Sequence, residues 1–383
     1  MQPDNAQHGE QWRLCFSLLP KVSRTFALSI AQLKSPMRHS VCLAYLLCRL
    51  LDTFEDAADL PTPRKSTYIN DLQAFVAGTA RPDPAWGRRA AAELAGRADG
   101  ADLELLECLD SVLAALDSLP MRDRQAIDRC FQEMATGMIE MQVLLDQSLA
   151  GSVPARLRVL PRMDSLERYC HFVAGIVGGL LTELLQLNSD ALDPERHRAL
   201  LSRSEAFGQY LQKINILKDI PGDHAAGWCF IPRSAIAAQG IAPEDLLNAP
   251  PELRVGAIAP VILDVLGHVA VAWQYLALIP LPEREYRLFL AYSFFFGVKT
   301  LELGLREPDR SFEAKRPLKI GRLDVAAILA RVNLLIDDPR GLEAYLRAIL
   351  DAARRGLDPR WPASVPAALE NVLGSLVPAG VEA

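Results

Sequence analysis

The sequence predicts an all-α protein, and three observations support that prediction. Apolar residues recur at three- and four-residue spacing along most of the chain. No segment alternates apolar and polar residues next to the turn chemistry of a hairpin. The gaps between the helical segments are short and rich in proline or glycine, without the composition of an interdomain linker. We therefore expect one helical domain over residues 1–383, with short flexible ends.

The predicted helices follow one another along the chain, with turn residues between them. They are expected over residues 41–51, 103–116, 123–145, 166–187, 202–218, 260–277, 284–305 and 324–332. The segment over residues 41–51 is apolar on nearly all sides, as is typical of a core helix. Helices of a bundle can face one another across a central cavity, so motifs far apart in the sequence can contribute to one site.

Composition excludes several classes of function. The chain has 383 residues, of which 50% are hydrophobic and 23% charged, and a net charge of −6. Mild acidity without a block of basic residues argues against binding to nucleic acid. Seven scattered cysteines without a CxxC pair favour reduced core thiols in a cytoplasmic protein.

The sequence also contains no evident targeting segment or membrane span. The polar N-terminus has no signal-peptide core. No uninterrupted apolar run reaches the about 18 residues that a membrane span needs. We expect no transmembrane helix, whereas peripheral contact with a membrane and the oligomeric state stay open.

Two acidic motifs are the most informative local feature. Asp52 and Asp56 are four residues apart at the end of the apolar segment, and Asp219 and Asp223 repeat this spacing farther along. Carboxylates at a helix C-terminus face the negative end of the helix dipole and repel one another, so a positive partner is expected. Magnesium commonly bridges one or two carboxylates to substrate phosphates. The motifs therefore predict Mg²⁺-dependent binding of diphosphate groups.

Further polar clusters would complete such a site. Ser23 and Arg24 could donate to phosphate oxygens, and Arg49 lies one turn before Asp52, where it could reach the same phosphate or pair with the acids. Gln212 and Asn215 share a helix face with Asp219 by their spacing.

Glycines and apolar residues near the motifs suggest a closely packed, apolar wall. Gly175, Gly178 and Gly179 cost helix stability, so they imply close approach of the backbone to another helix or a ligand. An apolar wall would shelter a carbocation formed when diphosphate leaves. The predicted wall residues are Leu46, Leu47, Phe54, Phe172, Val173, Ile176 and Val177.

Taken together, the motifs resemble those of the squalene/phytoene synthase family of head-to-head prenyl transferases. Four motifs occur in the family's order, over residues 22–27, 51–56, 169–178 and 212–223. The stretch over residues 317–320 is more similar to the squalene synthase branch, where this region helps to bind NADPH. The resemblance implies an isoprenoid-synthase helical bundle. It also implies Mg²⁺-dependent joining of two farnesyl diphosphates to presqualene diphosphate, followed by NADPH-dependent reduction to squalene.

The resemblance also assigns roles to individual residues. Tyr169 would assist the proton loss that closes the cyclopropane, and Lys319 would contact NADPH. The metal–diphosphate residues would be Asp52, Asp56, Asn215, Asp219 and Asp223. The residues that bind substrate or diphosphate would be Ser23, Arg24, Phe26, Tyr45, Arg49, Gln212, Asn215 and Lys218. His171, next to the tyrosine, is expected to be structural.

The chain departs from the family pattern at several positions. Gly222 replaces an acid in the second motif, and Pro221 is expected to unwind the helix there. Lys218 stands in place of arginine, which keeps the charge but loses the bidentate fork. Trp228 replaces a phosphate-binding arginine, and Gly321 stands where a basic residue is expected.

Three other readings therefore stay open. The first is a family member that works without NADPH and makes presqualene diphosphate, hydroxysqualene or phytoene. The second is a terpene synthase that uses one prenyl diphosphate. The third, of another class, is a non-catalytic helical assembly protein, against which the four retained aspartates argue.

Overall fold

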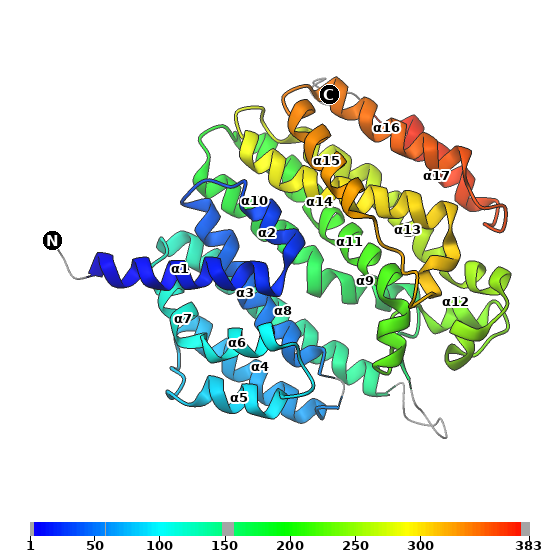
Figure 1. Cartoon of the computed structure of the whole chain (residues 1–383). Helices are drawn as coiled ribbons and strands as arrows, with labels where there is room; N and C mark the ends of the chain where they lie inside the picture. The colour runs from blue at the N-terminus through cyan, green and yellow to red at the C-terminus, as the bar shows by residue number, and fades with distance from the viewer. Residues whose placement is uncertain (1–3, 58, 148–156, 377–383) are drawn as a thin grey trace. The chain divides into compact units, whose positions relative to one another are not determined.

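The computed structural model describes residues 4–57, 59–147 and 157–376, and it confirms the all-α prediction (Figure 1). The side chains of residues 4–8 and of Arg24 lie outside the described part, as do residues 1–3 and 377–383, so the predicted flexibility of the chain ends falls largely outside it. The chain forms two compact units. The first comprises Met1–Val143 and Leu180–Asp190, and the second comprises Leu144–Gly179 and Ala191–Ala383.

The first unit is built around helix α3. Its helices are α1 (Asp4–Val22), α2 (Arg24–Ile30), α3 (Met37–Glu55), α4 (Thr62–Ala77), α5 (Trp86–Leu94), α6 (Gly100–Glu107), α7 (Leu109–Asp117), most of α8 (Met121–Gln147) and the end of α10 (Ile176–Asn188). Helix α3 contacts α1, α2, α4, α6 and α7. The predicted helix over residues 103–116 is divided into α6 and α7 at Cys108, whose ψ of 9° departs from the helical value.

The second unit is built around helix α11. Its elements are β1 (Arg158–Val159), α9 (Met163–Cys170), the π-helix η1 (His171–Gly175), the start of α10, α11 (Pro194–Ala225), β2 (Trp228–Cys229), α12 (Arg233–Ala237), the 3₁₀-helix η2 (Pro243–Asn248), α13 (Pro251–Leu278), α14 (Arg284–Arg306), the 3₁₀-helix η3 (Pro308–Phe312), α15 (Arg322–Leu335), α16 (Pro339–Arg355) and α17 (Ser364–Ser375). Helix α11 contacts α9, η1, α13 and α14. The two C-terminal helices, α16 and α17, lie beyond the last predicted segment.

Helix α11 corrects the expectation about Pro221. The helix continues through the proline to Ala225, so Asp219 and Asp223 stay one turn apart. Proline removes one backbone hydrogen bond, but tertiary packing supplies most helical stability in proteins. Ile216 and Ile220, at 3% and 5% exposure, bury the apolar side of this last part of the helix.

The structure contains a short pair of strands that no pattern in the sequence indicated. Within the described ranges, β1 and β2 form a parallel pair in which Arg158 lies opposite Trp228 and Val159 lies opposite Cys229. The Arg158 N–H donates to the carbonyl of Gly227 at 2.9 Å. Two residues are too few to produce a recognisable alternation, so no periodicity analysis could find these strands.

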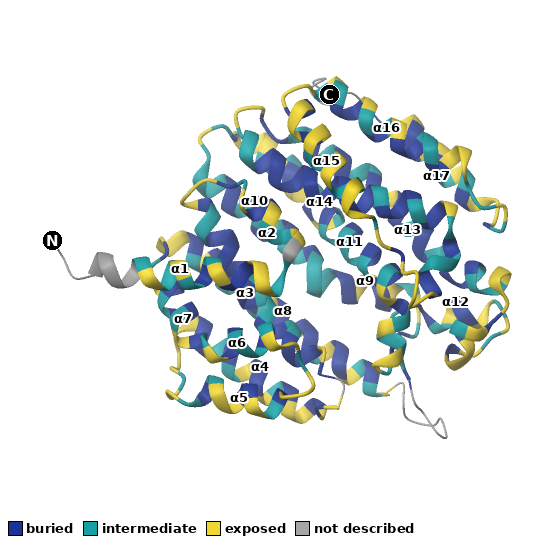
Figure 2. Ribbon diagram, in the orientation of Figure 1, coloured by how far each residue is buried: buried dark blue, intermediate teal, exposed yellow. Residues whose placement is uncertain are grey.

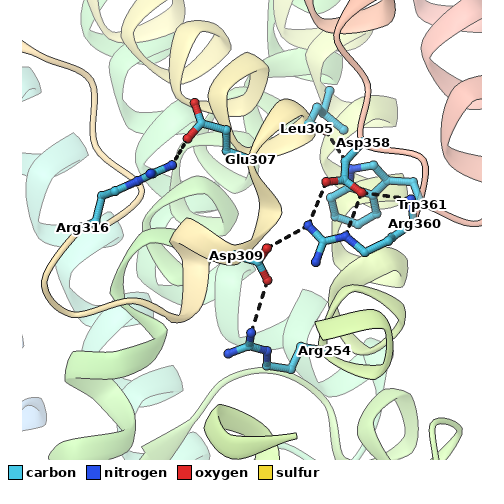
Figure 3. A network of polar contacts seen from close by, with 8 residues as sticks. All are labelled: Arg254, Leu305, Glu307, Asp309, Arg316, Asp358, Arg360 and Trp361. Carbon is cyan, nitrogen blue, oxygen red and sulfur yellow. Dashed lines mark hydrogen bonds and ion pairs between the residues drawn. The ribbon is translucent and has the colours of Figure 1, made fainter. Parts of the chain in front are cut away.

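Within the second unit, a polar network connects the segment between α16 and α17 to the end of α14 and to η3 (Figure 3). The guanidinium of Arg360 donates to Asp309 at 2.8 Å and to Asp358 at 2.7 Å, and Arg254 reaches the same Asp309 at 3.2 Å. The indole N–H of Trp361 donates to the carbonyl of Leu305 at 2.8 Å. The segment between α16 and α17 is therefore tied to the end of α14 and to η3.

Two of the three glycines expected at close backbone contacts are confirmed. A Cβ at Gly178 would lie 2.0 Å from the carbonyl oxygen of Ser204, and one at Gly175 would lie 2.8 Å from Cγ of Glu205. Both contacts are with α11. At Gly179 nothing lies within 4 Å of such an atom, so close approach to another helix is wrong there, while approach to a ligand stays a prediction.

These neighbouring glycines provide a matched stability test. Gly178→Ala is expected to lower the free energy of unfolding by about 2 kcal/mol or more, because backbone atoms would have to move apart. Gly179→Ala, in the same helix, should instead raise it by about 0.5 to 1 kcal/mol, because alanine restricts the unfolded chain. Thermal unfolding midpoints of the two variants measure this, and equal midpoints would contradict the predicted contact between α10 and α11.

Among the described residues, three helical stretches are long and apolar enough to cross a membrane, namely Met163–Asn188, Pro251–Leu278 and Arg284–Arg306. The buried shares of their most apolar windows are 39%, 56% and 89%, respectively. Helix α14 in particular uses its apolar surface to build the core (Figure 2). The absence of a transmembrane span and the cytoplasmic location stay predictions.

Candidate functional site

In the first unit, the candidate site residues follow a single stripe along α3. Thirteen residues of α3 are buried, but Tyr45, Arg49 and Asp52 are half-buried, and Asp56, which caps the helix, is exposed. The spacing of these four residues keeps them on one face of the helix. The Asp56 N–H donates to the carbonyl of Asp52 at 2.8 Å, so both carboxylates are carried by regular helical backbone. The structure therefore brings the first acidic pair together on a polar stripe.

The electrostatic environment of Asp52 is unusual for an aspartate. Burial, followed by repulsion from Asp56, raises the pKa of the Asp52 carboxyl from 3.8 to about 7, and Arg49 partly opposes this rise. Because like charges four residues apart disfavour full ionisation, a cation bound here would restore the charged form. This carboxylate pair thus has the properties that favour binding of a divalent metal.

The structure also shows a buried lysine at the C-terminal end of α3, which sequence reasoning missed. Lys65, at 1% exposure, donates through Nζ to the carbonyl of Glu55 at 2.5 Å and to Oε1 of Gln142 at 3.2 Å. A lysine at the last carbonyls of a helix offsets the negative end of its dipole. Burial nevertheless raises the pKa of Glu55 well above its usual range, with Asp56 and Asp52 adding to the rise. Lys65 therefore offsets the acidic cluster only in part.

Arg49 has a partner that the sequence did not reveal. Its Nε and a terminal nitrogen donate to the two carboxylate oxygens of Asp102 at 2.8 and 2.7 Å, a bidentate geometry. Asp102 belongs to α6 and is 3% exposed. A guanidinium held in this way keeps its remaining N–H groups in a defined direction. The phosphate contact expected of Arg49 stays a prediction.

Two residues at the start of α2, Ser23 and Phe26, form a small cluster with Tyr45 of the stripe. Ser23 caps α2 by accepting a hydrogen bond from the Phe26 N–H at 3.2 Å. The rings of Phe26 and Tyr45 are in contact, with centroids 5.3 Å apart. Burial raises the pKa of Tyr45 to about 12, and its hydrogen bond with Ser23 partly opposes this. The structure thus brings together Ser23, Phe26 and Tyr45, whereas the side chain of Arg24 lies outside the described residues.

The raised pKa of Asp52 has a consequence for stability. Because the folded protein holds this proton up to about pH 7 and the unfolded chain releases it near pH 4, stability is expected to fall as pH rises between these values. In Asp52→Asn, this decrease in the free energy of unfolding should be smaller by about 1 to 2 kcal/mol. The effect is less than the full pKa difference implies, because the side chain keeps contact with water.

Urea unfolding without Mg²⁺ at pH 4.5 and pH 8 measures this effect. The control is Asp110→Asn, which changes an exposed aspartate of α7 in the same unit. An unaltered pH dependence in Asp52→Asn would contradict the assigned environment.

In the second unit, the candidate residues form a corresponding stripe along α11. Gln212, Asn215, Lys218 and Asp223 are half-buried and Asp219 is exposed, while the intervening Lys213, Ile214, Ile216, Leu217 and Ile220 are buried. Lys218 Nζ donates to Oδ1 of Asn215 at 3.0 Å. Asp223 lines a small cavity whose wall also includes His224, Trp228 and Phe230. All five predicted residues of this helix are therefore on one accessible face.

Tyr169 lies at the end of α9, where the chain enters the π-helix. Its ring is 5% exposed and stacks on Phe230 with centroids 4.7 Å apart. Short π-helical turns inside α-helices are frequent at functional sites. Nδ1 of His171 lies 2.9 Å from Oε1 of Glu205 on α11. The structural role expected of His171 stays a prediction.

Predicted wall residues fall into two groups in the structure. Leu46, Leu47 and Phe54 have no exposed surface and belong to the core of the first unit, so the prediction is wrong for them. The residues of η1 and early α10 are half-buried and present an accessible apolar surface, as expected. These are Phe172, Val173, Ile176 and Val177.

A buried polar chain fixes α11 and was not predicted. Lys213 has no exposed surface and is ion-paired with Asp264 of α13. Its Nζ also donates to Oε1 of Gln209 at 2.9 Å, and Gln209 donates to Glu205 at 2.7 Å. A buried charge must be paired in this way. The chain holds α11 against α13 and, through the bond between Glu205 and His171, against η1.

Lys319, the residue expected to contact NADPH, is exposed between η3 and α15. Its neighbour Leu318 is 2% exposed and anchors the segment in the core. Gly321 precedes α15, and its N–H donates to Oδ2 of Asp324 at 3.0 Å. The segment is thus held on both sides of Lys319, but the cofactor role stays a prediction.

No preformed metal cage occurs in the part of the chain that the structure describes, since no three or more His, Cys, Asp or Glu side chains gather there as a metal site. Each unit instead offers a pair of aspartates one turn apart. This arrangement fits Mg²⁺, which usually binds one or two carboxylates together with substrate phosphates.

Comparisons with known proteins agree with these features. The sequence profile of the squalene/phytoene synthase family matches residues 19–324. A squalene synthase of Gibberella zeae is 27% identical over 327 residues, covering 85% of this chain and 65% of that protein. A squalene synthase of Schizosaccharomyces pombe is 29% identical over 324 residues, covering 84% and 65%. The chain thus spans just under two thirds of the length of these relatives.

Solved structures show the same fold. The structure of TcSQS with the ligand BPH1237 has a TM-score of 0.79 at 24% identity, covering 96% of this chain and 97% of that one. A dehydrosqualene synthase has a TM-score of 0.58 at 18% identity, covering 90% and 99%. The fold is therefore that of an isoprenoid synthase. Because the family profile spans most of the sequence and the motifs lie on two accessible helix faces, this chain belongs to the squalene/phytoene synthase family.

Proposed function

We propose that this protein joins two molecules of farnesyl diphosphate head to head to form presqualene diphosphate, in a reaction that requires Mg²⁺. The observation that supports the proposal most strongly is the pairing, in each unit, of two aspartates with amide, hydroxyl or cationic side chains on one accessible helix face. Family membership supports the same reaction class.

Each unit would bind one diphosphate group. Mg²⁺, held by Asp52 and Asp56 or by Asn215, Asp219 and Asp223, would neutralise charge on a diphosphate when bound. In the first unit, Ser23, Tyr45 and the remaining N–H groups of Arg49 would donate to phosphate oxygens.

The second unit would handle the chemistry of the carbon atoms. Lys218 and Gln212 lie on the face of α11 that carries the aspartates and would orient the diphosphate. Departure of diphosphate breaks a C–O bond and leaves an allylic cation, which bonds to the second substrate. The apolar residues over 172–177 would keep water from that cation. Loss of a proton, assisted by Tyr169, then closes the cyclopropane.

We further propose that NADPH reduces presqualene diphosphate to squalene, with Lys319 contacting the phosphate groups of the cofactor. The exposed position of Lys319 on an anchored segment supports this. The replacement of a basic residue by Gly321 makes the cofactor site poorer in charge than the family pattern implies.

Product analysis tests both steps. The purified protein is incubated with farnesyl diphosphate and Mg²⁺, with and without NADPH, and the lipid products are identified by mass spectrometry. The full proposal requires squalene only when NADPH is present. Presqualene diphosphate or an alcohol in both reactions would retain the condensation and reject the reduction. If neither farnesyl nor geranylgeranyl diphosphate yields a product, the condensation itself is rejected.

A further inference from the structure

A continuous stack of side chains connects Tyr169 to an arginine in the second unit. Tyr169 stacks on Phe230 with centroids 4.7 Å apart and planes inclined by 25°. The ring centroids of Phe230 and Trp228 are 6.2 Å apart, and their planes are inclined by only 8°. The guanidinium carbon of Arg158 lies 4.9 Å from the centre of the Trp228 ring. Four side chains thus follow one another from α9 to β1.

The end of this stack is held by backbone and ionic contacts. Parallel pairing of β1 with β2 places Arg158 directly opposite Trp228. Nε of Arg158 donates to Oδ1 of Asp146 at 2.9 Å, which orients the guanidinium. A cation over an indole ring is attracted by the negative face of the ring. Arg158, oriented by Asp146, therefore contacts the ring of Trp228 in addition to Phe230.

Burial restricts the remainder of the stack. Trp228 is 6% exposed and Tyr169 is 5% exposed, while Phe230 is half-buried between them. The stacking partner of Tyr169, Phe230, comes from the segment after β2 and not from the neighbouring π-helix. The tyrosine ring thus lies at one end of a column of rings that includes Trp228.

We propose that Trp228, clamped by Arg158, is a positioning residue for Tyr169. This inference rests on the proposed function, in which Tyr169 assists the loss of a proton. Trp228 would then have a positioning role of its own, and its presence would be more than the loss of a phosphate-binding arginine. Because a displacement of about 1 Å can slow a positioned reaction by about a hundredfold, removal of the supporting ring should reduce turnover without weakening substrate binding.

The first test compares two replacements at position 228. Trp228→Leu is expected to lower kcat for presqualene diphosphate about tenfold with KM changed less than about twofold, and to raise the share of alcohol side products. Trp228→Phe, which retains a ring, should restore most of the turnover. The matched control is Trp273→Leu, which removes a tryptophan of α13 at 1% exposure whose ring contacts Phe294 in a tilted arrangement. It should lower thermal stability but leave the product ratio unchanged.

The second test asks whether Trp228 acts through Tyr169. In a Tyr169→Phe background, Trp228→Leu should lower turnover by less than about twofold further, because both changes disable one function. If the loss of turnover in the double variant equals the product of the losses in the two single variants, the inference is overturned. If Tyr169→Phe alone left turnover unchanged, the proposed role of Tyr169 would fail instead, so the two failures can be told apart.

Arg158 is tested by its own matched pair. Arg158→Gln should reduce kcat about threefold and shift products in the same direction as Trp228→Leu. Arg162→Gln, which changes an exposed arginine paired with Asp164 in the same unit, should have no such effect. A rise in KM for farnesyl diphosphate with unchanged kcat in Arg158→Gln would show a diphosphate ligand rather than a clamp, and would overturn the inference.

Discussion

Replacing either Asp52 or Asp219 with asparagine is expected to reduce condensation by about a thousandfold or more, the largest effect predicted for this protein. Each change removes a negative charge from a pair of carboxylates on an accessible helix face while keeping nearly the same shape. In either variant, the rate of diphosphate release should no longer rise with the concentration of Mg²⁺. Turnover of farnesyl diphosphate over a range of Mg²⁺ concentrations is the measurement.

Folding has to be separated from this loss. Glu195→Gln provides the control for Asp219→Asn, because it makes the same chemical change at an exposed position in the first turn of α11. Its activity should equal that of the unaltered protein. Asp52→Asn should fold normally, since it removes a carboxylate whose burial disfavours its charge. Wild-type turnover in either aspartate variant would refute the metal assignment of that unit.

Tyr169→Phe is expected to slow formation of presqualene diphosphate by about a hundredfold with KM changed less than about threefold. The variant loses only a hydroxyl group and retains the ring that stacks on Phe230. Binding of the substrates should therefore persist, whereas the step that loses a proton should become slow. Single-turnover experiments that follow both consumption of farnesyl diphosphate and formation of the cyclopropane measure the two quantities separately.

Thermal unfolding of Tyr169→Phe serves as the control, and a midpoint close to that of the unaltered protein is expected. An unchanged rate of cyclopropane formation would remove Tyr169 from the mechanism. The position of the stack would then be a matter of stability only, and the inference about Trp228 would lose its basis.

The four departures from the family pattern differ in their structural consequences. Gly222 and Pro221 leave α11 intact, so the second aspartate pair keeps its spacing. Lys218 is hydrogen-bonded to Asn215 and keeps a positive charge on the stripe. The backbone N–H of Gly321 donates a hydrogen bond to the carboxylate of Asp324 at the start of α15. Trp228 contacts the ring of Phe230 and the guanidinium of Arg158.

Sequence reasoning was strong for long helices and for spacing within one helix. The apolar periodicity predicts α3 over residues 41–51 and α11 over residues 202–218, and the spacing of Gln212, Asn215 and Asp219 places them on one helix face. These conclusions need only local geometry, since 3.6 residues complete each turn of any α-helix. The motif order was also sufficient to indicate the family. For Asp219 and Asp223, however, the sequence suggested no shared face, because Pro221 was expected to unwind the helix between them.

The partners of the site residues could be found only in the tertiary structure. Asp102 lies 53 residues from Arg49, and Trp228 lies 70 residues beyond Arg158 in the sequence, a pairing carried by strands of two residues. No local pattern encodes contacts at such separations, because they depend on how whole helices and loops fold against one another. The sequence alone therefore determined the all-α class, the central helices α3 and α11, the spacing within each aspartate pair and the family. The charge environment of Asp52, the survival of α11 past Pro221 and the support of Tyr169 by Trp228 are properties of long-range packing.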